Sequence, residues 1–221
     1  MPAAHRTRTP QPPDPSEIEF RYAMQVPIGD PYDPGRLFDR WHVTMQRVLW
    51  SDDDESELTQ LAHASAVVIH PFRFLHERSI FDAADEDGGD LNDLVTAAIA
   101  ADGHLAEDLQ VQLAMDGSGL LFLDNVTVAE ERRGHGYGWQ LAAELIVTLG
   151  HRCAAVLIFP APPGGRSQMS DVEHEAACRG LAGYWERLGF FPAGRDNLYL
   201  LDPAVANPEL LEALGPGRYI G

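Results

Sequence analysis

Residues 124–138 decide how the whole chain is interpreted, and they read Asp124-Asn125-Val126-Thr127-Val128-Ala129-Glu130-Glu131-Arg132-Arg133-Gly134-His135-Gly136-Tyr137-Gly138. The stretch begins in a strand-like apolar run, and its three alternating glycines lead into a segment with helical periodicity. Glycine lets the backbone turn so that successive amide N–H groups face one point, where the helix N-terminus adds partial positive charge. The stretch therefore predicts a pyrophosphate site that needs no lysine. A purely structural turn is the alternative.

The flanking segments predict the sheet around this loop. Residues 138–149 have one apolar face, and strands are predicted at 120–128 and 154–159, so the order strand, helix, strand favours a parallel pair with a right-handed crossover. A further strand is predicted at 109–115, joined to the next by the hairpin signal of residues 116–119. The sheet is therefore expected to be mixed.

A second motif follows about fifty residues later. Ser170-Asp171-Val172-Glu173 has the form of a capping box and predicts the start of a helix. That helix runs into Tyr184-Trp185-Glu186-Arg187-Leu188-Gly189-Phe190-Phe191, where Gly189 is expected to end it. The two phenylalanines are expected to begin another strand.

Together the two motifs resemble those of the GNAT superfamily of N-acetyltransferases, which use acetyl-CoA or another acyl-CoA. The family's phosphate-binding pattern is matched by Arg133, Gly136 and Gly138, and its later pattern of aromatic, acid, base, Leu, Gly and Phe by residues 185–190. The resemblance covers about residues 109–200. It implies an α/β (α+β) fold with a mixed, splayed, mostly antiparallel sheet flanked by helices.

The resemblance also implies acetyl-CoA as the co-substrate. The central strands would open to admit its pantetheine arm, which pairs with the backbone near Val126 and Val128, while the glycine loop binds the pyrophosphate. The residues expected at this site are Val126, Thr127, Val128, Arg133, Gly134, His135, Gly136, Tyr137, Gly138 and Trp185. Chemistry would be direct attack of a primary amine on the thioester.

Two residues are the catalytic candidates. Asp124 is the candidate base because it lies at the strand end beside the expected thioester, and a structural hydrogen-bonding role is the alternative. The family commonly has a Tyr where Trp185 stands, and indole is not a comparable acid, so the neighbouring Tyr184 is the candidate acid. On a helix its side chain points about 100° away from that of Trp185. The reserve candidates are His76, Glu77 and His174.

Composition excludes several classes of chemistry. The 16 basic residues are all Arg, which excludes a phosphate loop with its Lys, a Schiff-base lysine and a Ser-Lys pair. A net charge of −18 disfavours nucleic acid as a partner. Two cysteines and the lack of a long apolar run predict a cytoplasmic protein without a membrane partner. No metal is expected, because His174 and Cys178 lack a second ligand pair.

The N-terminal part is less informative. Residues 1–16 predict a flexible Pro-rich arm, and residues 17–221 a single domain. Strands are predicted at 18–26 and 66–74, with a turn-rich segment at 27–35 after the first. The acidic residues 52–57 suit the first turn of a helix, and Asp90 is expected to cap another helix that reaches residue 101.

The favoured hypothesis is an N-acyltransferase that acts on a primary amine. Residues 130–195 contain seven Arg and seven acidic residues, so the entire negative excess lies outside the expected cofactor region. The acceptor is expected to be a small-molecule or peptide amine, a cationic acceptor such as a polyamine, an aminoglycoside-like amine or a basic peptide end is a secondary hypothesis, and a homodimer is possible. The alternatives are a non-catalytic CoA-binding or interaction module and a nucleotide-binding protein that uses the same loop.

Overall fold

The computed structural model describes residues 14–25, 37–50, 56–70, 80–87, 89–101, 105–110, 112, 119–162, 169–194 and 197–205. They form a seven-stranded sheet of order β1-β2-β3-β4-β5-β7-β6. Its strands are β1 (Ile18–Gln25), β2 (Phe38–Trp50), β3 (Ser56–Ile69), β4 (Gly119–Val128), β5 (Cys153–Ile158), β6 (Phe191–Pro192) and β7 (Tyr199–Leu201). All neighbours are antiparallel except β4 and β5, which confirms the mixed, mostly antiparallel sheet.

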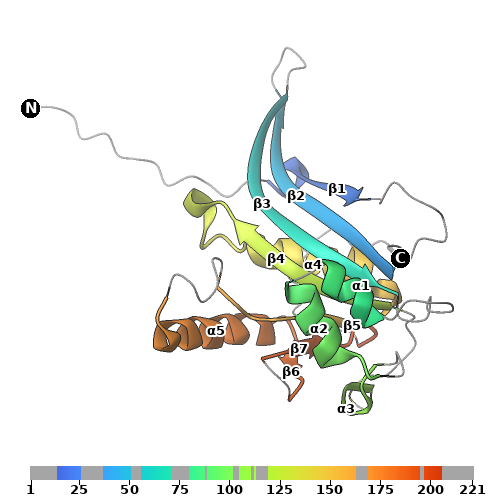
Figure 1. Ribbon diagram of the computed structural model, residues 1–221. Coiled ribbons are helices and arrows are strands. Elements are labelled where there is room, and N and C mark those ends of the chain that lie inside the picture. Colours follow the sequence, from blue (N-terminus) through green and yellow to red (C-terminus); the bar gives the residue numbers. More distant parts are fainter. Residues whose placement is uncertain are drawn as a thin grey trace, which may run out of the picture.

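Strands β2 and β3 form a long hairpin that rises above the rest of the sheet (Figure 1). The prediction of a helix start at residues 52–57 is wrong for Ser56 and Glu57, which pair with Trp50 and Leu49 of β2. Cross-strand pairing decides the conformation there, and Glu57 is a solvent-exposed strand residue. The strand predicted at 66–74 consequently begins at Ser56 and ends at Ile69.

The strand, helix, strand unit around the glycine loop is confirmed. β4 is followed by α4 (Tyr137–Leu149) and then by β5, which is parallel to β4. The two strands pair only over residues 119–122 of β4, although β4 continues to Val128. From residue 123 onward this edge of β4 therefore has no strand partner on the β5 side among the described residues.

Helices cover both faces of the sheet, with α1 (Ile80–Asp87) and α2 (Asp90–Ala98) on one face and α4 on the other (Figure 1). The first core layer joins α1 and α2 to sheet residues such as Val67 and Phe122. The second joins α4 to residues such as Met45 and Val156. Because successive residues of a strand point to opposite faces, each central strand contributes to both layers.

Two helix predictions need correction. The helix predicted at 90–101 ends at Ala98, and Gly89 rather than Asp90 is its N-cap residue. Residues 109–115 were predicted as a strand, but Leu109 and Gln110 belong to the short helix α3 (Glu107–Gln110). Leu109 is buried in this single helical turn. Hydrophobic periodicity in so short an apolar run does not distinguish a helix from a strand.

The predicted arm is ordered at its end. Pro15–Glu17 form a 3-10 turn, and the N–H and hydroxyl of Ser16 both donate to the Asp14 carboxylate at 2.9 and 2.8 Å. Residues 1–13, the turn-rich segment 27–35 and residues 116–118 of the predicted hairpin lie outside the described residues.

The second motif is confirmed in detail. Ser170 and Glu173 form the capping box that begins α5 (Asp171–Glu186). Gly189 adopts a φ of 93°, which ends the helical segment, and β6 begins at Phe191. Within α5 only Cys178 and Ala182 are buried. Most of this helix is therefore exposed in the described structure.

Candidate functional site

The three glycines of the loop are required for two different reasons. Gly134 and Gly136 have φ values of 81° and 80°, and no atom lies within 4 Å of a Cβ built on either one. They are needed for the left-handed backbone, which leaves the space in front of them open. A Cβ on Gly138 would instead lie 3.1 Å from Val128 Cγ2 and 3.3 Å from the Tyr184 hydroxyl. Gly138 therefore permits close packing of α4 on β4 and α5.

Helix α4 begins without a side-chain cap. Its N-cap residue is Gly136, which has no side chain and so makes no side-chain cap hydrogen bond to the first turn. The first amide N–H groups of an α-helix have no partner within the helix, so they are available to an anion. Arg133, which was predicted to bind phosphate, is exposed next to this helix start.

The side chains of His135 and Tyr137, two other residues predicted at the loop, make contacts within the chain. Nδ1 of His135 lies 3.0 Å from the carbonyl oxygen of Arg133 and 3.2 Å from that of Arg132, and its ring stacks on Tyr137. Tyr137 is 6% exposed and packs in the α4 core layer, and burial raises the pKa of its phenol. The side chain of Tyr137 thus faces the core, which leaves its backbone amide as the group that a ligand could reach.

The predicted strand residues lie on the part of β4 that has no strand partner on the β5 side in the described structure. Val126 and Val128 turn their side chains toward the α4 core layer. Thr127 alternates to the other face, where its hydroxyl donates to the Asn125 side-chain oxygen at 2.8 Å. An extended chain containing amides can pair with an unpartnered strand edge, as peptides do in β-augmentation.

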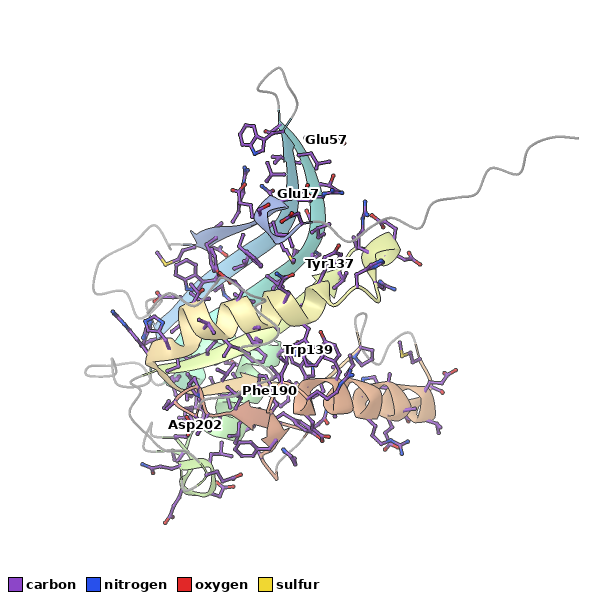
Figure 2. The ribbon with its side chains drawn as sticks, turned by 180° about the vertical axis from the view of Figure 1, so that it is seen from behind. Glu17, Glu57, Tyr137, Trp139, Phe190 and Asp202 are labelled. Carbon is purple, nitrogen blue, oxygen red and sulfur yellow. The ribbon has the colours of Figure 1, made fainter. Side chains whose placement is uncertain are left out.

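Buried donors near the loop add to this site, and they were missed from the sequence. Arg132 Nε and Trp139 Nε1 are buried, and neither has a hydrogen-bond partner among the described residues. Trp139 lies in the first turn of α4, at the junction with α5 (Figure 2). Buried polar groups are usually hydrogen-bonded, so each atom could donate to an acceptor from outside the described residues. No spacing rule in the sequence distinguishes Trp139 from a core residue.

The two neighbouring aromatic residues of α5 point in different directions. The Tyr184 hydroxyl reaches α4 beside Gly138, and its ring contacts that of Trp139 at a centroid distance of 5.9 Å. Trp185 packs edge-on against Phe190 at 5.5 Å in the α4 core layer. Tyr184, and not Trp185, therefore presents its polar atom to the start of α4.

Burial raises the pKa of Tyr184 to about 12, and the nearby Arg187 guanidinium opposes the shift. That guanidinium lies 5.6 Å from the centroid of the Tyr184 ring and 5.2 Å from that of Trp139. Tyr184 is therefore a protonated donor at neutral pH. Its ring contacts one aromatic neighbour, Trp139, and one cationic neighbour, Arg187.

Asp124 lies at a bulge in β4. Its neighbours Leu123 and Asn125 pair with Ala66 and Ser65, so Asp124 is the extra residue. The Ser65 hydroxyl donates to the Asp124 carboxylate at 2.7 Å. This places the candidate base at the point where the β4 edge becomes free.

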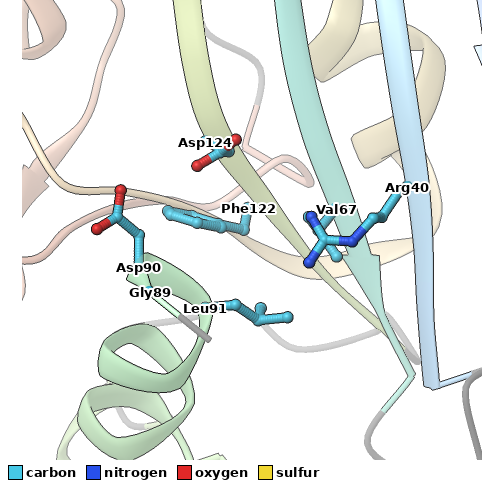
Figure 3. Close-up of a pocket in the computed structure, with 7 residues that line it drawn as sticks. All are labelled: Arg40, Val67, Gly89, Asp90, Leu91, Phe122 and Asp124. Atoms are coloured by element: carbon cyan, nitrogen blue, oxygen red, sulfur yellow. The ribbon is translucent and has the colours of Figure 1, made fainter. Parts of the chain in front are cut away.

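Asp124 also lines a pocket of about 350 Å³ on the face that α1 and α2 cover (Figure 3). The other walls come from Arg40 of β2, Val67 of β3, Phe122 of β4 and the first residues of α2. Burial, followed by repulsion from Asp124 and Asp93, raises the pKa of Asp90. The roles of Arg40 and Asp90 were not predicted, because they converge only through the sheet register.

Of the three reserve candidates, only His174 belongs to the described residues. His76 and Glu77 lie outside the described residues. His174 contacts Cys178 on α5, with Nδ1 3.6 Å from the thiol sulfur. In the described part of the chain, no three His, Cys, Asp or Glu side chains form a group that could hold a metal ion. No described helix is long and apolar enough to cross a membrane.

Comparison with protein-family models, curated proteins and solved structures gives no match to this chain.

Proposed function

We propose that this protein is an acyl-CoA-dependent N-acyltransferase that transfers an acetyl group from acetyl-CoA to a primary amine. The observation that carries the proposal is the uncapped start of α4, which follows a free strand edge in β4. The glycine loop between them provides backbone donors in front of the helix dipole. The motifs that resemble the GNAT family lie on these same elements.

The donors present fit a CoA ester. Its pyrophosphate and pantetheine amides are rich in oxygen acceptors, and its thioester supplies the activated acyl group. The α4 amides and Arg133 would hold the pyrophosphate, and the β4 backbone at residues 126–128 the amide arm. Arg132 Nε and Trp139 Nε1 are buried donors that such a ligand would satisfy.

The chain's own residues then handle protons. Transfer forms an N–C bond and breaks the C–S bond, so the amine loses one proton and the thiolate gains one. Asp124, held by Ser65 at the bulge, accepts the amine proton as the new bond forms. Tyr184 donates a hydrogen bond to the leaving sulfur. Its pKa of about 12 keeps the phenol protonated throughout, so water supplies the proton that the thiolate finally takes.

A non-catalytic CoA-binding module is the second candidate. It is favoured by Trp185, which packs in the core at the position where the resembling family commonly has Tyr. The raised pKa of Tyr184 also favours it, because a phenol that stays protonated offers the leaving thiolate a hydrogen bond but no proton.

Thiol release and calorimetry distinguish the two candidates. The full chain is mixed with acetyl-CoA and a wide panel of primary amines, and free thiol is titrated against a control without protein. Release above that control with at least one amine supports the acyltransferase. CoA binding by calorimetry with no release across the panel supports the module, and displacement of CoA by ATP would favour a nucleotide-binding protein.

A further inference from the structure

The pocket beside Asp124 has opposite charges at its two ends. Figure 3 shows the guanidinium of Arg40 on one side and the carboxylates of Asp90 and Asp124 on the other. Between them lie the apolar side chains of Val67 and Phe122, each 2% exposed. The pocket thus has a cationic end, an apolar middle and an anionic end.

The sheet register fixes the span of this pocket. Arg40 pairs with Val67, and Val67 pairs with Phe122, so the three residues form one row across β2, β3 and β4. The backbones of Arg40 and Phe122 are two strand spacings apart, a separation of roughly 10 Å. The Arg40 side chain extends from one end, and Asp124 lies just beyond the other. A short molecule is enough to bridge the remaining space.

We infer that this pocket binds the acceptor and selects an amino acid: a small molecule with a primary amine at the Asp90 and Asp124 end and a carboxylate at Arg40. The inference rests on the proposed function, and it names the substrate class of the same site. The volume of about 350 Å³ lies near the lower end of the roughly 300–1,000 Å³ of small-molecule sites, which favours a free amino acid over a protein segment.

The amine end is matched by charge. Asp90 and Asp124 are close enough to repel each other, and a positively charged amine between them relieves that repulsion. Asp124 lies at the start of the free β4 edge, where the proposed thioester arm would pair. The bound ammonium first loses one proton to water, and the neutral amine is then next to the acyl group that it attacks and to Asp124, which is proposed to take its second proton.

The carboxylate end is matched by geometry. A guanidinium has five donors in a planar fork and binds a carboxylate through two parallel hydrogen bonds. These donors are numerous enough to hold an acceptor in addition to contacts within the chain. The buried row of Val67 and Phe122 provides an apolar surface for methylene groups between the two charges.

A chain-length series tests this inference. The ω-amino acids from glycine to 6-aminohexanoate are compared with n-alkylamines and α,ω-diamines of matched length, using thiol release and kcat/KM. We expect one or two of the amino acids to exceed the matched alkylamine and diamine by about ten-fold or more. Diamines or alkylamines that are equal or better at every length would overturn the inference while leaving the acyltransferase proposal intact.

Variants assign the carboxylate to Arg40. In Arg40→Gln the ratio of kcat/KM for the best amino acid to that for its alkylamine should fall about ten-fold or more. The matched control is Arg152→Gln, which removes an exposed charge in the 3-10 turn before β5 and should keep the ratio. An unchanged ratio in Arg40→Gln would overturn the inference.

Binding gives a readout that does not depend on turnover. The CoA-saturated protein is titrated with the same amino acids by calorimetry. Binding that Arg40→Gln weakens, without thiol release from any amine, supports the pocket assignment and contradicts catalysis. Absence of both binding and turnover with amino acids, when another amine class is acylated, contradicts the pocket assignment alone.

Discussion

The two helices α4 and α5 begin in opposite ways. At α5 the Ser170 hydroxyl accepts the Glu173 N–H, and the Glu173 carboxylate accepts the Ser170 N–H at 3.0 Å. At α4 the N-cap is Gly136 in a left-handed conformation, which has no side chain to cap the first turn. Side chains of α5 satisfy its first donors, whereas the N-cap residue of α4 has no side chain that could do so.

Packing explains how α4 tolerates an uncapped start. Leu141, Leu145 and Ile146 are at most 1% exposed, so burial of an apolar face stabilises α4. Helix α5 buries only Cys178 and Ala182, and it depends more on its capping box. The difference indicates that α5 is stabilised locally by its cap, while α4 is stabilised by burial and does not need one.

The largest effect is expected from a negative charge in the α4 loop. Gly136→Asp should raise the Kd for CoA at least about 100-fold, because it opposes an anion and strains a left-handed backbone. Calorimetry measures the change. Gly194→Asp is the matched control, since Gly194 has a φ of 78° in equally open space away from the loop. Equal CoA affinity in the two variants would refute the role of the α4 start.

Removal of the Tyr184 hydroxyl tests its proposed role as a hydrogen-bond donor to the leaving sulfur. Tyr184→Phe should lower kcat for acetyl transfer about 10- to 100-fold with little change in the Kd for CoA. Tyr199→Phe removes a hydroxyl from β7 and serves as the control. Because the Tyr184 pKa is raised to about 12, the wild type should keep this contribution as pH rises to 10. A Tyr184-dependent loss near pH 8 contradicts this role.

A methyl group at Gly138 should disturb the packing of α4 against α5. Gly138→Ala places a Cβ 3.1 Å from Val128 Cγ2 and 3.3 Å from the Tyr184 hydroxyl, and should cost about 1–2 kcal/mol in the free energy of unfolding. Gly180→Ala on α5 meets open space and should stabilise by up to about 1 kcal/mol. Urea denaturation measures both, and a neutral Gly138→Ala would contradict the close approach.

The smallest effect is expected at the α5 cap. Ser170→Ala should cost about 1 kcal/mol in the free energy of unfolding and leave CoA affinity unchanged. Hydrogen bonds from the Ser170 side chain and backbone lower the pKa of Glu173, so their stabilising effect is present above the unfolded pKa and lost as pH falls through the folded value. The stability gap between wild type and Ser170→Ala should therefore narrow in acid without closing, because the bond from the Glu173 N–H to the Ser170 hydroxyl does not titrate, and a constant gap would contradict this linkage.

The sequence predicted the parts of the fold that local patterns control. The β4, α4, β5 unit, the Ser170 cap and the Gly189 stop depend on periodicity and on residues with special backbone preferences. Ser56 and Glu57 were misassigned because pairing with β2, which a local window does not contain, overrides the acidic helix signal.

The parts of the site that local motifs encode were predictable from the sequence, and the parts that the fold brings together were not. The glycine loop was visible in the sequence, whereas Asp124 was predicted at a strand end and lies instead at a bulge within β4, which continues to Val128. The pocket was not, because Arg40 and Asp90 meet Asp124 only through a register that spans three strands and a helix. Whether Tyr184 or Trp185 faces the start of α4 depends on the rotation of α5 about its own axis. Helical spacing in the sequence does not determine that rotation.

The central claim is that the uncapped start of α4 binds the pyrophosphate of CoA. Calorimetric titration of the wild-type chain with CoA and with pantetheine, which lacks the pyrophosphate, tests it most directly. The predicted result is that CoA binds at least about 100-fold more tightly than pantetheine. Equal affinity for the two ligands, or no binding of CoA, would contradict the claim.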